Sequence, residues 1–120
     1  MLGKLIDEHG SDVWLVNTGW TGGAFGVGKR MKLGHTRSMV HALLRGDLHS
    51  AALDKDPIFG LEVPKHIAGV PDDVLNPRNT WSDKNAYDEQ AKKLAGMFRD
   101  NFAKFEKHVS EAVKAAGPGA

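Results

Sequence analysis

A regular row of apolar side chains in the last third of the chain most limits what this sequence can fold into. The row repeats at intervals of four, three, four, four, three and four residues, through Tyr87, Ala91, Leu94, Phe98, Phe102, Phe105 and Val109. Because an α-helix has 3.6 residues per turn, this spacing predicts an amphipathic helix over residues 83–107, with a frayed continuation through Val113. Ser82 or Asp83 is the expected N-cap. We expect residues 1–113 to be ordered and residues 114–120 to form a disordered tail.

Two further helices are predicted nearer the N-terminus. Residues 2–9 place three apolar side chains at helical spacing, and Gly10 follows as a helix stop. The second helix has Thr36 as its expected N-cap and Gly46 as its stop. Its apolar positions are Met39, Val40, Leu43 and Leu44.

Two short strands are predicted as well, so the expected fold class is α/β with few strands. Residues 13–16 are continuously apolar, which is typical of a strand that is covered on both faces. Residues 59–63 alternate between apolar and other residues until Pro64 ends the run. Residues 64–81 contain three prolines and few periodic apolar positions, so we expect an irregular surface connection. No internal repeat or linker divides the chain.

Composition excludes several classes of function. Sixteen Lys and Arg against fifteen Asp and Glu give a net charge of +1, which lacks the excess expected of a protein that binds nucleic acid or a membrane surface. The absence of cysteine excludes disulfides, thiolate metal sites and a cysteine nucleophile. No apolar stretch approaches the ~18 residues of a membrane span, and the start of the chain lacks a signal-peptide core. A cytoplasmic location is therefore expected.

A glycine-rich segment is the candidate ligand site. Five of the fourteen glycines lie between positions 19 and 28, and Lys29 and Arg30 follow them. Glycine backbone and fixed cations suit an anion such as a phosphate. Gly23, Gly28 and Lys29 match part of a P-loop, but Arg30 stands where a magnesium-binding hydroxyl is needed, which argues against that motif. The alternative is that the glycines only build tight turns around aromatic side chains.

Other polar groups are assigned structural roles. The six histidines have no metal-ligand spacing, so no metal site is expected. The acidic pairs Asp72-Asp73 and Asp54 with Asp56 are interpreted as turn residues rather than as catalytic carboxylates. No catalytic residue is assigned. The run LNPRNTW, with Arg78 and Trp81, is interpreted as a structural clamp at the start of the long helix.

Several motifs together resemble the ATP-dependent phosphoenolpyruvate carboxykinases. They are, in order, LVNTGWTGGAFGVGKRMKL, HTRSMVHALLRGDL, FGLEVP, GVPDDVLNPRNTW and DKNAYDEQAKKLAGMF. The resemblance extends from Leu2 to Glu106. Family members are several times longer, and this chain is similar to their C-terminal segment. The resemblance implies that residues 1–120 form the C-terminal portion of the nucleotide-binding lobe.

The resemblance also implies an activity and a site. Family members are lyases with kinase character that convert oxaloacetate and ATP to phosphoenolpyruvate, ADP and carbon dioxide in gluconeogenesis. Arg30, Met31 and Thr36 correspond to residues that contact ATP in the family. The phosphate loop, the ligands of the divalent metal (Mg or Mn) and the oxaloacetate-binding arginines have no counterpart here. The expected partners are therefore oxaloacetate, ATP and the remainder of a carboxykinase chain, and the segment alone is expected to be inactive.

An alternative of another class remains open. The chain could be a free-standing, non-catalytic module that binds a nucleotide or another anion through residues 19–30. The two hypotheses differ in what surrounds Arg30: a nucleotide pocket completed by other parts of an enzyme, or a loop that binds an anion by itself.

Overall fold

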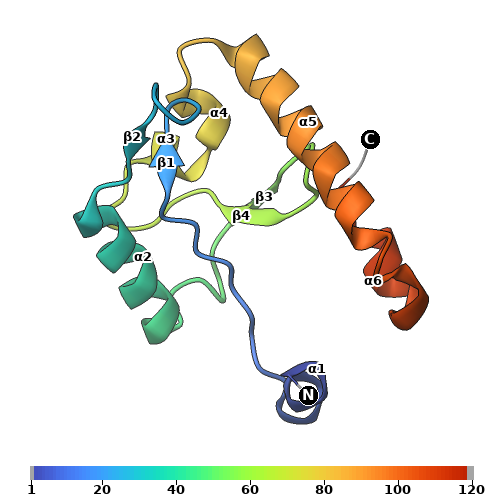
Figure 1. Cartoon of the computed structure of the whole chain (residues 1–120). Helices are drawn as coiled ribbons and strands as arrows, with labels where there is room; N and C mark the ends of the chain where they lie inside the picture. The colour runs from blue at the N-terminus through green and yellow to red at the C-terminus, as the bar shows by residue number, and fades with distance from the viewer. Residues whose placement is uncertain (1, 119–120) are drawn as a thin grey trace.

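Glycines end the first two helices, as the sequence predicts. The computed structural model describes residues 2–118 (Figure 1). Helix α1 covers Leu2–His9 and α2 covers Leu33–Arg45. Gly10 (φ 58°) and Gly46 (φ 75°) follow them in the left-handed conformation that favours glycine. The predicted N-cap of α2 is wrong, because Lys32 holds that position and Thr36 lies inside the first turn.

The strands form two small antiparallel sheets beside the helices. Strand β1 (Trp20–Thr21) pairs with β2 (Lys29–Arg30), so that Trp20 lies opposite Arg30. Strand β3 (Leu53–Lys55) pairs with β4 (Glu62–Pro64). The strand expected over residues 59–63 is therefore displaced toward Pro64. Its partner β3 was not predicted, because its sequence Leu-Asp-Lys has no alternating pattern. The fold thus combines helices with small sheets.

The buried strand expected at residues 13–16 is wrong. Within residues 2–118 no strand pairs with this segment, which runs extended between α1 and β1 (Figure 1). Val13 and Leu15 are 64% and 84% exposed. A strand is buried on both faces only when neighbouring strands and helices cover it. The described residues supply neither, so an apolar stretch remains in contact with solvent.

The long C-terminal helix is shorter than predicted. Helix α5 covers Lys84–Phe102, and the carboxylate of Asp83 caps it by accepting hydrogen bonds from Asn85 N (2.9 Å) and Ala86 N (3.1 Å). The helix ends at Phe102 rather than at residue 107. A 3-10 turn (Glu106–His108) follows, and Ser110 then caps helix α6 (Glu111–Ala115). Serine favours an N-cap over a helix interior, which explains why α6 begins as a separate helix.

The tail that was predicted to be disordered, residues 114–120, begins inside a helix. Lys114 and Ala115, which were expected in the disordered tail, lie in α6. The last two residues, 119 and 120, are outside the described residues.

A small core lies beneath α2. It consists of Met39, Ala42, Leu48, Ile67 and Val70, all at most 9% exposed. Ile67 and Val70 come from residues 64–81, so the expectation that this segment is only a surface connection is wrong. The same segment also forms two short helices, α3 (Asp72–Leu75) and α4 (Pro77–Thr80).

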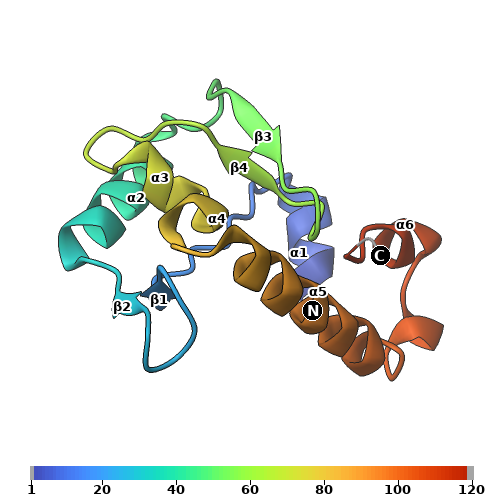
Figure 2. The ribbon, with the colours of Figure 1, turned by 90° about the horizontal axis from the view of Figure 1, so that it is seen from above.

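Much of the apolar surface stays uncovered. Ala91 and Ala95 are buried on α5, whereas Phe98 and Phe105 of the predicted stripe are 51% and 53% exposed. Figure 2 shows α5 extending away from α4 toward α6. The radius of gyration is 15.9 Å, against about 14 Å for a compact chain of this length. No helix within residues 2–118 has the length and apolar character needed to cross a membrane.

His49 connects the extended segment to the turn that follows α2. His49 Nδ1 lies 2.8 Å from Gly46 O, and Nε2 lies 2.6 Å from Asp12 Oδ2. Both neighbours are acceptors, so only the protonated ring can donate to both. The hydrogen bond to Gly46 O, followed by the hydrogen bond and charge of Asp12, raises the pKa of His49 above its ordinary value of 6.5.

We predict that replacing the α5 cap destabilises the fold. Asp83→Ala removes two hydrogen bonds to N–H groups that the helix cannot satisfy itself, so the free energy of unfolding should fall by about 1 kcal/mol. Ser82→Ala is the matched control and should change it by less than about 0.5 kcal/mol. Urea unfolding followed by circular dichroism measures both. Equal effects of the two substitutions would contradict the assignment of Asp83 as the cap.

The contact between His49 and Asp12 should depend on pH. Because the folded-state pKa is raised, its contribution to stability is present below pH 6.5 and is lost as pH rises through the folded-state pKa. Asp12→Asn should lower the His49 pKa partway, since Gly46 O remains as an acceptor. NMR titration of the His49 ring in both proteins measures this. An identical titration would show that Asp12 does not act on the ring.

Candidate functional site

The glycine-rich segment is the loop of a β-hairpin. It connects β1 to β2, and Ala24 O accepts hydrogen bonds from Val27 N (3.0 Å) and Gly28 N (2.9 Å). Gly22 and Gly26 have φ of 79° and 89°. A P-loop connects a strand to a helix, whereas this loop joins two antiparallel strands. The structure therefore confirms that the segment is not a P-loop.

Close packing within the loop explains two of its glycines. A Cβ on Gly28 would collide with Gly23 O, and one on Gly23 would lie 2.9 Å from Gly28 N. The rings of Trp20 and Phe25 meet edge to face, with centroids 5.5 Å apart. This geometry agrees with the interpretation of the glycines as turn formers. If the glycines only form turns, Lys29 and Arg30 are the charged groups of this segment that could contact a ligand.

The three predicted ATP-contacting residues flank the junction between β2 and α2. Arg30 is the last residue of β2 and is exposed. Within residues 2–118, its guanidinium has no ion pair or side-chain hydrogen bond. The Met31 side chain packs against the core, and its N–H donates to Gly19 O (3.0 Å). Thr36 is partly buried in the first turn of α2.

Sequence reasoning missed Thr80, which joins the hairpin to α4. Its hydroxyl accepts hydrogen bonds from Thr21 Oγ1 (3.1 Å) and Gly22 N (3.0 Å) and donates to Pro77 O (2.7 Å). Thr80 follows Pro77 by three residues, and threonine commonly bonds the carbonyl three positions earlier. That local pattern is visible in the sequence, but its contacts with the hairpin are not.

The LNPRNTW segment acts as the predicted clamp. The Arg78 guanidinium binds both carboxylate oxygens of Asp88 on α5, at 2.8 and 3.0 Å. The rings of Trp81 and Tyr87 meet edge to face at 5.6 Å. The Lys84 ammonium donates to Arg78 O, Asn79 O and Trp81 O, at 2.7 to 3.0 Å. A lysine has three N–H donors, so these carbonyls at the end of α4 use all of them.

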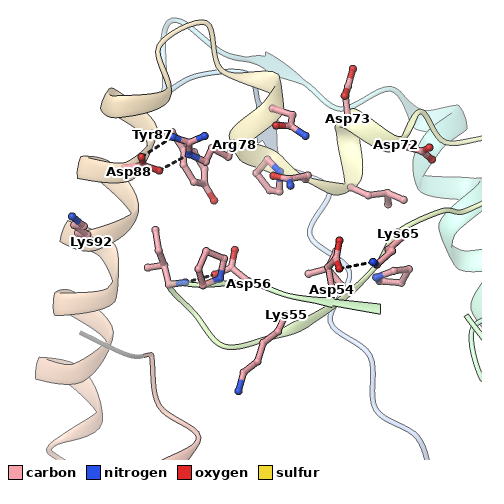
Figure 3. Close-up of a pocket in the computed structure, with 18 residues that line it drawn as sticks. Asp54, Lys55, Asp56, Lys65, Asp72, Asp73, Arg78, Tyr87, Asp88 and Lys92 are labelled. Carbon is pink, nitrogen blue, oxygen red and sulfur yellow. Dashed lines mark hydrogen bonds and ion pairs between the residues drawn. The ribbon is translucent and has the colours of Figure 1, made fainter. Parts of the chain in front are cut away.

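The structure also contains an open cleft of about 650 Å³, lined in part by Arg78 and Asp88 of the clamp (Figure 3). It is lined by residues 54–58, 63–65, 72–73 and 75–79 together with Tyr87, Asp88 and Lys92. Arg30, Met31 and Thr36 do not line it. Burial, followed by the charges of Asp56 and Asp88, raises the pKa of Tyr87, so its hydroxyl stays protonated at neutral pH. The hydrogen bond from Arg78 lowers the pKa of Asp88.

The acidic residues of the cleft were predicted to be turn residues, and this is correct only for Asp56, because Asp54 lies in β3 and Asp72 and Asp73 lie in α3. Asp56 accepts hydrogen bonds from Ile58 N and Phe59 N in a turn. Asp54 pairs with Lys65, and Asp72 pairs with His66. Among residues 2–118, no three His, Asp or Glu side chains are grouped so that they could hold a metal ion.

Comparison with known proteins confirms the resemblance. A family model described as phosphoenolpyruvate carboxykinase matches residues 1–73. A Bacillus pumilus protein named phosphoenolpyruvate carboxykinase (ATP) is 57% identical over 118 residues. Relatives of that name from Bacillus subtilis and Moorella thermoacetica, the latter numbered 2, are 55% and 53% identical over 118 residues. Each match covers 98% of this chain and 22% of the relative, so the chain spans about a fifth of their length.

We predict that the hairpin loop does not tolerate a side chain at Gly28. Gly28→Ala forces the loop open, because the added Cβ overlaps backbone atoms that cannot move independently. The thermal midpoint should fall, and the tryptophan fluorescence should shift, because Trp20 lies in the hairpin. Gly34→Ala is the matched control, since no atom lies within 4 Å of its added Cβ, and it should leave both unchanged or raise the midpoint. A midpoint that is unaffected by Gly28→Ala would contradict the loop geometry.

Proposed function

Because the chain belongs to the phosphoenolpyruvate carboxykinase family, we propose that it forms part of an ATP-dependent enzyme of that family. The reaction of the whole enzyme converts oxaloacetate and ATP to phosphoenolpyruvate, ADP and carbon dioxide, a cytoplasmic step of gluconeogenesis. The chain contributes the C-terminal part of the nucleotide-binding lobe. Three relatives named phosphoenolpyruvate carboxykinase (ATP) match 98% of the chain and support this proposal.

The observation that carries the proposal is the state of Arg30. Its side chain is exposed and, within residues 2–118, has no acidic partner, although many of the charged groups around the cleft are paired. A planar guanidinium can stack on a purine and donate to ribose oxygens. We assign Arg30 to the adenine and ribose side of ATP.

Met31 and Thr36 complete the base-side contact. The N–H of Met31 is already bound to Gly19 O, so its carbonyl is the backbone group left for a ligand. A carbonyl accepts hydrogen bonds, which suits the amino group of adenine. Thr36 supplies a hydroxyl that can donate or accept. Met31 packs against the core, and Thr36 is partly buried in the first turn of α2, so both groups come from ordered backbone.

The remaining parts of the active site belong to the rest of the enzyme. Phosphoryl transfer needs groups that surround the phosphates, and a divalent metal (Mg or Mn), when bound, neutralises their charge. The residues described here do not fit such a metal, since they contain no suitable cluster. We therefore assign the metal, the phosphate loop and the oxaloacetate site to the remainder of the carboxykinase chain. The 120 residues alone are expected to be inactive.

The exposed residues 13–16 support the proposal that this chain is part of a larger enzyme. They combine strong β propensity with apolar side chains in contact with solvent, a combination that favours pairing with a sheet. We propose that the remainder of the enzyme covers them. In the alternative of a free-standing anion-binding module, fewer loop N–H groups are available to an anion, because those of Gly22, Val27 and Gly28 are bound within the protein.

Arg30→Ala tests the site in a full-length protein. We define the carrier enzyme as the Bacillus subtilis relative with its matching segment replaced by this chain. In the carrier enzyme, Arg30→Ala should weaken ATP binding by roughly 5- to 30-fold, the equivalent of about 1–2 kcal/mol for a desolvated cation-π contact. Arg37→Ala removes the same charge from α2 and should change the affinity by less than about twofold. Titration calorimetry with ATP measures both.

Unchanged ATP affinity in Arg30→Ala would remove the site assignment. An equal loss in both variants would indicate a general effect of charge. ATP-coupled decarboxylation of oxaloacetate by the purified 120-residue chain would contradict the assignment of the other parts to the rest of the enzyme.

A further inference from the structure

We propose that Thr80 is a positioning residue for nucleotide binding, because its hydroxyl fixes the β1–β2 hairpin on α4 and thereby fixes Arg30. This inference rests on the proposed function, since it takes Arg30 as the ATP contact. Thr80 itself is expected to touch no ligand. It lies 59 residues from Thr21 in the sequence, so the connection exists only in the folded chain.

The hairpin cannot hold its own position. Each of its strands has two residues, and an isolated two-stranded hairpin is marginally stable even when it is longer. Its loop side chains add little, because Phe25 and Val27 are 85% and 77% exposed. The orientation of Arg30 therefore depends on contacts outside the hairpin.

The Thr80 hydroxyl is used completely. It donates its one proton to Pro77 O (2.7 Å) and accepts from Thr21 Oγ1 (3.1 Å) and Gly22 N (3.0 Å). A hydroxyl has one donor and two acceptor positions, so these three bonds saturate it. Gly22 also approaches Thr80 closely, since a Cβ on Gly22 would lie 3.2 Å from Thr80 O. Two consecutive residues of the hairpin are thus held at one point.

Helix α4, which holds the hairpin through Thr80, is itself bound to α5. Lys84 binds three carbonyls at the end of α4, and Arg78 binds Asp88 through two hydrogen bonds. Across the hairpin, Thr21 pairs with Lys29, the neighbour of Arg30. A shift of Thr21 is therefore transmitted through the ladder to Arg30. The position of Arg30 therefore depends on α5, through α4 and the hairpin.

A purely structural role for Thr80 makes different predictions. If its hydroxyl served only to stabilise α4 through Pro77 O, its loss would lower stability without a specific effect on ATP. If Thr80 acts through Arg30, its loss must weaken ATP binding only while Arg30 is present. Serine keeps the hydroxyl, whereas valine keeps the shape and removes all three hydrogen bonds.

The experiment compares Thr80→Val, Thr80→Ser and Arg30→Ala in the carrier enzyme, with the two combinations that include Arg30→Ala. We expect Thr80→Val to weaken ATP binding by about fivefold, the equivalent of one lost hydrogen bond. Thr80→Ser should stay within about twofold of the parent. In the Arg30→Ala background, Thr80→Val should cause no further loss. Titration calorimetry with ATP provides these values.

Amide hydrogen exchange at Gly22 gives a second readout that does not depend on ATP. Exchange should be faster in Thr80→Val and unchanged in Thr80→Ser. If Thr80→Val does not fold, Thr21→Val replaces it, since that change removes only the bond between the two threonines. It should accelerate Gly22 exchange and weaken ATP binding in the same direction, by a smaller factor.

Three results would overturn the proposal: unchanged ATP affinity in the valine variants, an equal loss with and without Arg30, or a serine variant that behaves like valine. Failure of the proposed function is distinguishable. In that case Arg30→Ala leaves ATP affinity unchanged, while Gly22 exchange still reports whether Thr80 holds the hairpin.

Discussion

The arrangement of the molecule depends on the polar junction at the end of α4. There, one ammonium group binds three backbone carbonyls and one hydroxyl holds the neighbouring hairpin. Lys84 and Thr80 are the side chains that form it. A helix of four residues has almost no stability of its own, because every carbonyl lies near its end. The contacts of Lys84 and Thr80 stabilise α4, and through them α4 connects α5 to the glycine-rich hairpin.

Polar contacts matter here because apolar packing is sparse. The core beneath α2 is small, and residues 13–16, Phe98 of α5 and Phe105 after it remain in contact with solvent. Such surface is costly to leave in water, and it is typical of regions that contact other parts of a protein. The exposed surface agrees with the finding that the chain spans about a fifth of the length of its relatives, since the rest of such a protein can cover this surface.

Local signals in the sequence succeeded where one residue decides the backbone. Gly10 and Gly46 end helices because left-handed conformations favour glycine, and of the two predicted caps of α5, Ser82 or Asp83, it is the Asp83 carboxylate that reaches free N–H groups. The residues assigned to ATP remain a prediction, and the structure adds that Arg30 is exposed and that Met31 has a bound N–H. Burial could not be predicted for residues 13–16, because it depends on neighbours that the pattern only assumes.

The sequence by itself determined the family, the ends of the first two helices at glycines, and the mismatch to a P-loop at Arg30. These follow from short-range chemistry, or from motifs in a fixed order. Only the tertiary structure decided that Thr80 reaches Thr21 and Gly22, that Ile67 and Val70 enter the core, and that the glycine-rich loop closes on itself. The physical reason is that each of these contacts joins atoms whose meeting depends on how the intervening chain folds in three dimensions.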